Sequence, residues 1–219
     1  MRVLELFAGK RCIGRAFERK GHDVFSVDWD ESLDNIDLNC DIKELTAKKV
    51  IEKIGVPDVI WASPDCTTYS VSAIGRHRRK NHDTGELEAV SEYASVCDDV
   101  NRHLVNLIME LKPRYFFIEN PRGGLRKMGF MSGLPRYTVT YCQYGDNRMK
   151  PTDIWTNHPD PCFKPMCRNG DKCHTPAPRG SHSGTEGLKN RLDKAAIPEQ
   201  LCDHIVEICE GTLKPRSST

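Results

Sequence analysis

The chain has 219 residues, a length that suits one domain with a small appendage and that can bury a core without disulfides. Its 32 lysines and arginines nearly balance 31 aspartates and glutamates, which gives a formal net charge of +1. This balance excludes a chain that is polycationic throughout, so a nucleic-acid partner would have to meet a local basic patch.

No apolar run approaches the roughly 20 residues that a membrane span needs. The opening MRVLELFAGK becomes polar too soon for a signal peptide. We therefore expect a soluble, cytoplasmic protein, and a monomer. Its ten cysteines are then expected to be reduced thiols rather than a disulfide framework.

The hydrophobic pattern predicts strands that alternate with helices. Strands are predicted at residues 2–9, 22–30, 57–63, 114–121, 137–145 and 152–157, and helices at 12–21, 42–55, 89–112 and 197–209. Residues 71–88 are predicted to form a long polar loop. The alternation favours an α/β fold with a Rossmann-like, doubly wound, mostly parallel sheet.

Polar clusters follow four of the predicted strands: FAG, DWD, SPDC and ENP. In a doubly wound sheet, ligands sit beyond the carboxyl ends of the strands. All four clusters are therefore expected to line one edge, where they would form a site.

The first two clusters have features of a nucleotide site. Gly9 follows a strand directly, where a glycine lets backbone approach a ligand, and Asp28 lies about twenty residues further on, where a carboxylate can hold ribose hydroxyls. Trp29 could flank an adenine ring, and Asp41 with Ile42 could meet its edge. The alternatives are a plain strand-to-helix turn and aspartates that cap helices.

Cys66 and Glu119 stand at the ends of the other two strands. Hydroxyl residues rather than core residues surround Cys66, and Glu119 ends an apolar run where a carboxylate is costly to bury without a role or a partner. A thiol and a carboxyl group placed in this way suit attack on C6 of cytosine, with the carboxyl group binding N3 and the amino edge, so that C5 can take a methyl group from a sulfonium donor.

With these residues in place, the sequence resembles the DNA cytosine-5 methyltransferase family. LELFAG is similar to its first motif, VDWD to its ribose-binding motif, VIWASPDCTTYS to its nucleophile motif and IENP to its Glu-Asn-Val motif. YGDNRMKPTDIW is similar to the Gln-Arg-Arg motif, and AAIPEQLCDHIVE to the closing motif. The resemblance covers most of residues 1–155 and, more weakly, 191–210.

The resemblance implies a class I S-adenosylmethionine-dependent methyltransferase acting on double-stranded DNA with base flipping. It implies catalytic roles for Cys66, Glu119, Arg148 and Lys150. It implies that S-adenosylmethionine is bound by Phe7, Gly9, Asp28, Trp29, Asp41, Ile42 and Ser63. The predicted domains are a catalytic domain at 1–155, a small irregular segment for target recognition or zinc at 156–190, and a helix with a frayed tail at 191–219 that packs back on the catalytic domain.

The sequence departs from the family pattern at several points. Asp65 replaces the proline that normally precedes the cysteine, and Thr67 replaces a glutamine. A carboxylate beside the thiol is expected to raise its pKa. The region after residue 156 is short for a recognition domain, which suits a compact phage or plasmid member.

The basic stretch GRHRRKNH follows the nucleophile motif, at the position of the family loop that closes over the flipped base. Phosphate contacts are predicted for Arg76, Arg78, Arg79 and Lys80. The alternative is a solvated surface run.

The segment after residue 156 holds a group of metal-ligand residues. Zinc binding is predicted for Cys162, Cys167, Cys173 and His174, because a metal would organise a segment with few apolar residues. The alternative is a set of reduced loop cysteines, since the spacing matches no strong signature.

Three other functions remain open at the level of the sequence. One is methylation of an exocyclic amine, although SPDC lacks the second proline and the aromatic of that class. Another is a non-catalytic DNA-binding or regulatory protein with the same fold. The third changes only the substrate, to RNA or a free nucleotide.

Overall fold

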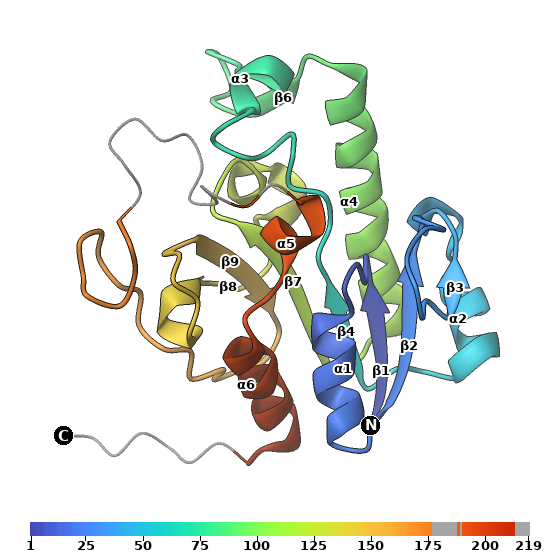
Figure 1. The fold of residues 1–219 in the computed structure, drawn as a ribbon. Helices are drawn as coiled ribbons and strands as arrows, with labels where there is room; N and C mark the ends of the chain where they lie inside the picture. The colour runs from blue at the N-terminus through green and yellow to red at the C-terminus, as the bar shows by residue number, and fades with distance from the viewer. Residues whose placement is uncertain (177–187, 189, 213–219) are drawn as a thin grey trace.

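The apolar runs predicted as strands pair into one seven-stranded sheet, in the order β3-β2-β1-β4-β7-β9-β8. The computed structural model of the chain describes residues 1–176, 188 and 190–212 (Figure 1). The strands are β1 (Arg2–Leu6), β2 (Asp23–Asp28), β3 (Leu38–Asn39), β4 (Val59–Ala62), β7 (Tyr115–Pro121), β8 (Arg136–Thr140) and β9 (Pro151–Thr156).

The strand directions confirm the predicted doubly wound, mostly parallel sheet. β1 pairs in parallel with both β2 and β4, β2 with β3, and β4 with β7, whereas β9 is antiparallel to β7 and to β8. The chain proceeds outward from β1 to β3 and then returns to the other side of β1. The strand order therefore reverses between β1 and β4, which is where open α/β sheets bind ligands.

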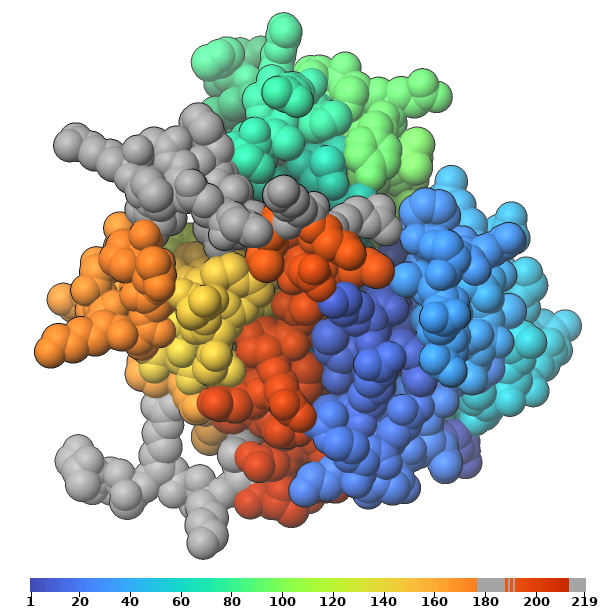
Figure 2. Space-filling model, viewed as in Figure 1, coloured from blue at the N-terminus to red at the C-terminus, as the bar shows by residue number. Residues whose placement is uncertain are grey.

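Helices cover both faces of this sheet. They are α1 (Cys12–Arg19), α2 (Ala47–Ile54), α4 (Glu92–Leu111), α5 (Arg191–Ala195) and α6 (Glu199–Glu210), with short 3-10 turns η1 (Ile42–Glu44), η2 (Leu125–Lys127), η3 (Gly129–Met131) and η4 (Tyr141–Tyr144). α1 and α6 lie side by side on one face, and their surfaces meet in the space-filling view (Figures 1 and 2). α4 packs with η1 and α2 on the other face.

The alternation of side chains along β1 explains how one strand serves both layers. Leu4 and Leu6 belong to the core cluster that includes α4, whereas Val3 belongs to the cluster under α1 and α6. All three side chains are fully buried. A strand with two buried faces is typical of the centre of a parallel sheet.

α4 is the longest helix, and its ends follow from local chemistry. The Ser91 hydroxyl accepts a hydrogen bond from the Ala94 amide at 3.2 Å, which caps the first turn. Lys112 adopts a left-handed conformation with φ of 47°, and Pro113 follows, so the helix stops there.

The prediction of a polar loop at residues 71–88 is wrong. This stretch forms α3 (Ile74–His77) and an antiparallel hairpin of β5 (Arg78–Lys80) and β6 (Leu87–Ala89). The Asn81 side chain accepts hydrogen bonds from the amides of Asp83 and Thr84, which organises the turn.

Two smaller differences also have local causes. The predicted helix at 42–55 is interrupted, because the Thr46 hydroxyl caps Lys49 and starts α2 afresh after η1. The predicted strand at 137–145 ends at Thr140, where the chain coils into η4. β3 was not predicted, because two residues carry no detectable period.

None of the described helices is long and apolar enough to cross a membrane. Within the region predicted as an irregular segment, residues 157–176 contain no helix or strand. Residues 177–187, 189 and the predicted frayed tail from 213 onward lie outside the described part of the chain. The division into domains at 156 and 190 stays a prediction.

Candidate active site

The carboxyl edge of the sheet gathers the four polar clusters. Gly9 lies just beyond β1, Asp28 ends β2, Cys66 follows β4, and Glu119 lies in the last part of β7. β4 and β7 are hydrogen-bonded neighbours in which Ala62 pairs with Ile118. The nucleophile candidate and the carboxyl candidate therefore emerge from adjacent strands.

The turn after β1 is built around Asp28. The Gly9 amide donates a hydrogen bond to Asp28 Oδ2 at 2.9 Å, and the Asp30 amide donates to Oδ1 at 3.0 Å. Gly9 has φ of 50°, and a Cβ added there would meet only the Phe7 carbonyl oxygen at 4.0 Å. Phe7 itself adopts φ of 55°. The backbone of this turn thus presents an open face to a ligand.

The other residues predicted to bind a cofactor have distinct settings. Trp29 is 60% exposed, whereas Ile42 is buried. Asp41 accepts a hydrogen bond from the Lys43 amide at 2.9 Å and caps η1, as the alternative reading expected, while its side chain remains half exposed. Ser63 Oγ accepts a hydrogen bond from Trp61 Nε1 at 2.9 Å, which fixes the end of β4.

Three sets of hydrogen bonds stabilise the turn that carries Cys66. The amides of Tyr69 and Ser70 donate to the Cys66 carbonyl at 3.0 and 2.8 Å. Asn120 Nδ2 donates to the Pro64 carbonyl at 2.9 Å, which ties β7 to this turn. Asp65 accepts from the Thr67 amide at 2.6 Å and from the Tyr93 hydroxyl. Asp65 therefore replaces the family proline with a side chain that organises the turn.

The environment of Cys66 disfavours ionisation of the thiol. Burial, together with the charges of Glu119 and Asp65, raises its pKa to about 11, and Lys150 opposes them. Burial lowers the pKa of Lys150, while Glu119 and Cys66 counteract that effect. These mutual influences indicate that Cys66, Glu119 and Lys150 share one electrostatic environment.

We expect Asp65→Asn to make Cys66 more reactive. The amide keeps the size of the side chain and removes one negative charge beside the thiol, so the pKa of Cys66 falls. Alkylation by iodoacetamide at pH 8 should accelerate about two- to tenfold. The matched control is Asp99→Asn, an exposed carboxylate of α4. Equal rates in both variants would contradict the role of Asp65.

Glu119 has a buried partner that sequence reasoning missed. Its side chain is 5% exposed, and Oε1 accepts a hydrogen bond from the Tyr141 hydroxyl at 2.9 Å. Tyr141 is fully buried, and both burial and Glu119 raise its pKa well above the ordinary value. In the sequence, Tyr141 is one aromatic residue within the strand predicted at 137–145, and nothing there distinguishes it from a core residue.

Lys150 and Arg148 lie in the segment between η4 and β9. Lys150 Nζ lies 4.5 Å from the centroid of the Tyr141 ring and donates to the Lys194 carbonyl at 2.9 Å. Arg148 forms an ion pair with Asp146, and its buried Nη1 has no hydrogen-bond partner among the described residues. The structure therefore brings Lys150 to Tyr141, and Arg148 retains one donor for a ligand.

Arg78 does not belong with the predicted phosphate contacts. It is 3% exposed, and its guanidinium donates two hydrogen bonds to Asp98 of α4, at 2.7 and 3.1 Å. It also donates to Thr68 and lies 4.0 Å from the centroid of the Tyr69 ring. The sequence prediction is wrong here because it treated the whole basic run as surface. Arg76, Arg79 and Lys80 are exposed.

The predicted metal group is also revised. Cys142, Cys167, Cys173 and His174 place their ligand atoms within 4.8 Å of one another, so they could hold a metal ion. Cys162 is not a member of this group, although the sequence predicted it. The fourth ligand residue is instead Cys142 of η4. Cys142 lies 25 residues before Cys167 and outside the dense cysteine run.

Comparison with known proteins identifies one family. A profile of the C-5 cytosine-specific DNA methylase family matches residues 1–128. A protein of Frog virus 3 (isolate Goorha), named "Probable DNA (cytosine-5)-methyltransferase", is 28% identical over 230 residues, which cover 95% of this chain and 100% of the viral one.

A solved structure has a similar fold. It is an E. coli "putative DNA modification methyltransferase encoded within prophage", with a TM-score of 0.51 and 17% identity. The match covers 71% of this chain and 46% of that chain, so the present chain spans under half the length of that neighbour.

Proposed function

Since the chain belongs to the C-5 cytosine-specific DNA methylase family, we propose that it methylates C5 of cytosine in double-stranded DNA. The methyl donor in this proposal is S-adenosylmethionine, and the reaction proceeds through a covalent bond between Cys66 and C6 of a flipped-out base. The observation that carries the proposal is that Cys66 follows β4 and Glu119 lies in the adjacent strand β7, with Lys150 in the same electrostatic environment.

The turn after β1 suits the donor. The open backbone face at Gly9 allows close approach, and the exposed Trp29 ring can cover one face of an adenine. Asp28 retains free lone pairs for ribose hydroxyls after accepting two amide hydrogen bonds. Phe7, Asp41, Ile42 and Ser63 complete the proposed donor site. When bound, the donor supplies an electrophilic methyl group on a sulfonium.

The proposed reaction begins with the Cys66 thiolate. It forms a bond to C6 of cytosine, and the electron pair of the C5–C6 double bond shifts so that C5 becomes nucleophilic. C5 would then take the methyl group, and the sulfonium sulfur would keep the electron pair of the broken S–C bond and leave as a neutral thioether. Loss of the C5 proton to a base and departure of the Cys66 thiolate from C6 restore the aromatic ring.

Glu119 would bind the edge of the flipped base. Its carboxyl group faces a hydroxyl donor, Tyr141, which fixes one of its oxygens and leaves the other for N3 and the amino group of cytosine. Transfer or sharing of a proton at N3 lets the ring accept the electron density that attack at C6 supplies. In this proposal Lys150 offsets the negative charge of Cys66 when the thiol ionises, which is supported by the lowering effect of Lys150 on the pKa of Cys66.

The exposed basic residues of the β5–β6 hairpin are proposed to contact phosphates. Arg79→Ala combined with Lys80→Ala should weaken DNA binding and reduce the slope of log affinity against log salt by about 1 for each lost contact. Replacement of Lys48 and Lys53, two exposed lysines of α2, serves as the matched control. A slope that does not change in the hairpin variant would refute phosphate contact there.

The function is tested by nucleoside mass spectrometry of DNA from cells that express the chain. We expect 5-methylcytosine above the level of cells with an empty vector. If N4-methylcytosine appears instead, the exocyclic amine is the target. If only RNA gains a methyl group, the substrate is RNA and the proposal of a DNA substrate is wrong.

A further inference from the structure

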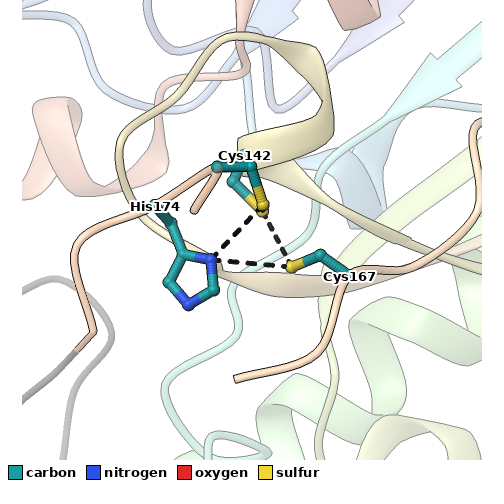
Figure 3. A group of neighbouring side chains, drawn as sticks. Cys142, Cys167 and His174 are labelled. Carbon is teal, nitrogen blue, oxygen red and sulfur yellow. Dashed lines mark hydrogen bonds between the residues drawn. The ribbon is translucent and has the colours of Figure 1, made fainter. Parts of the chain in front are cut away.

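The cysteine–histidine cluster formed by Cys142, Cys167, Cys173 and His174 lies outside the proposed reaction. We propose that these four residues bind one zinc ion, which fastens the segment after β9 to η4. Figure 3 shows Cys142, Cys167 and His174 converging on a common centre. Cys142 belongs to η4, whereas the other three residues lie in the irregular stretch 157–176.

The separations of the ligand atoms fit tetrahedral coordination. With Zn–S bonds of about 2.3 Å and Zn–N bonds of about 2.0 Å, a tetrahedron has S–S edges of about 3.7 Å and S–N edges of about 3.5 Å. Cys173 Sγ lies 3.6 Å from Cys142 Sγ and 3.5 Å from His174 Nδ1. Cys167 Sγ lies 3.7 Å from the same nitrogen.

The edge between Cys142 Sγ and Cys167 Sγ is shorter, at 3.0 Å. A shift of less than 1 Å in one side chain would bring this edge to the tetrahedral value. Three thiolates and one imidazole form a donor set that is typical of closed structural zinc sites. The zinc would therefore hold structure and leave no open position for catalysis.

The surroundings of His174 support a ligand role. Its side chain is 8% exposed. Nδ1 faces the sulfurs of Cys167 and Cys173, and Nε2 has no hydrogen-bond partner in the described part of the chain. A buried imidazole without a nitrogen or oxygen partner is costly, and metal coordination at Nδ1 would offset that cost.

Backbone hydrogen bonds already hold the irregular stretch 157–176 against the residues on either side of η4. The Cys167 amide donates to Thr140 Oγ1 at 3.1 Å, and the Thr175 amide donates to the Asn147 carbonyl at 2.9 Å. Because residues 157–176 have no helix or strand, few backbone hydrogen bonds hold them otherwise. A four-ligand metal would supply the missing cross-link between two distant stretches of chain.

The site would also brace the base-binding side of the candidate active site. Cys142 directly follows Tyr141, the partner of Glu119. The segment that leaves η4 carries Lys150. Loss of zinc is therefore expected to loosen the segment that positions Tyr141 and Lys150.

The test uses the full chain purified without chelator. We expect about one zinc per chain by elemental analysis, and Co²⁺ added to the zinc-stripped protein should give the intense visible absorption of tetrahedral thiolate coordination. Cys142→Ser and Cys173→Ser should each abolish stoichiometric zinc. The matched control is Cys162→Ser, which lies in the same segment and should keep its zinc.

Zinc below about a fifth of an equivalent together with no cobalt spectrum would overturn the proposal. So would loss of zinc from Cys162→Ser but not from Cys142→Ser, or a Cys142–Cys167 disulfide in the alkylated wild-type protein. If the serine variants do not fold, the cobalt titration of the wild type still decides the question. Metal content is read without methylation, so a zinc-loaded chain that does not methylate contradicts only the proposed function.

Discussion

Cys66→Ser should reduce cytosine-5 methylation by at least about 10³-fold, because the reaction cannot begin without a thiolate at C6. A serine hydroxyl at this half-buried position beside Glu119 and Asp65 does not ionise at physiological pH. The variant should also fail to form a stable complex with a duplex that contains 5-fluorocytosine. In the wild type, that base retains the adduct because elimination requires C5 to lose a proton, and fluorine in its place cannot leave as a cation.

Cys209→Ala is the control for this experiment, since Cys209 is a buried cysteine of α6 that the candidate site does not include. It should methylate and form the covalent complex like the wild type. Methylation that survives in Cys66→Ser would favour an exocyclic amine as the target. A wild type that binds DNA and never forms the complex would favour a non-catalytic protein.

Glu119→Gln should have the second largest effect, a loss of about 10²- to 10⁴-fold in kcat. Glutamine can still accept the hydrogen bond from Tyr141, so the local structure is preserved. It cannot hold or exchange a proton at N3 of the base. The measurement is single-turnover methylation of a duplex, with DNA affinity determined separately.

Glu119→Gln should also change the alkylation rate of Cys66, and this rate should rise while methylation falls. Glu119 raises the pKa of Cys66, so removal of its charge lowers that pKa and should accelerate alkylation of the thiol. A loss of methylation together with faster alkylation separates a role at the base from a role at the nucleophile. If alkylation and methylation both fall, the substitution has damaged the site as a whole. Tyr141→Phe should reduce methylation less than Glu119→Gln does.

The sheet could be predicted from the sequence because its strands are short apolar runs whose tails carry polar residues. β1, β4 and β7 have this form, and their carboxyl ends define the candidate site through topology alone. Parallel pairing needs no knowledge of side-chain contacts. Cys66 and Glu119 could therefore be selected before the structure.

The residues that were missed or misplaced depend on contacts between distant parts of the chain. Tyr141 reaches Glu119 across 22 positions, and Cys142 meets Cys167 across 25. Cys162 was predicted as a metal ligand because it is close to Cys167 in the sequence, but in the fold it does not belong to the metal-ligand group. Arg78 looked like its basic neighbours, and only the position of Asp98 on α4 separates it from them.

The burial of Arg78 has a mechanical consequence for the hairpin that follows Cys66. Its guanidinium joins the nucleophile turn, through Thr68, to α4, through Asp98. Extracting a buried ion pair of this kind costs about 3–5 kcal/mol, far above thermal energy. The base of the hairpin is therefore anchored to both of these elements. Leu87 of β6, near the tip of the hairpin, packs against the core cluster that contains α4, so the tip is held as well. The ion pair and this contact together tie the hairpin to the scaffold that carries Cys66.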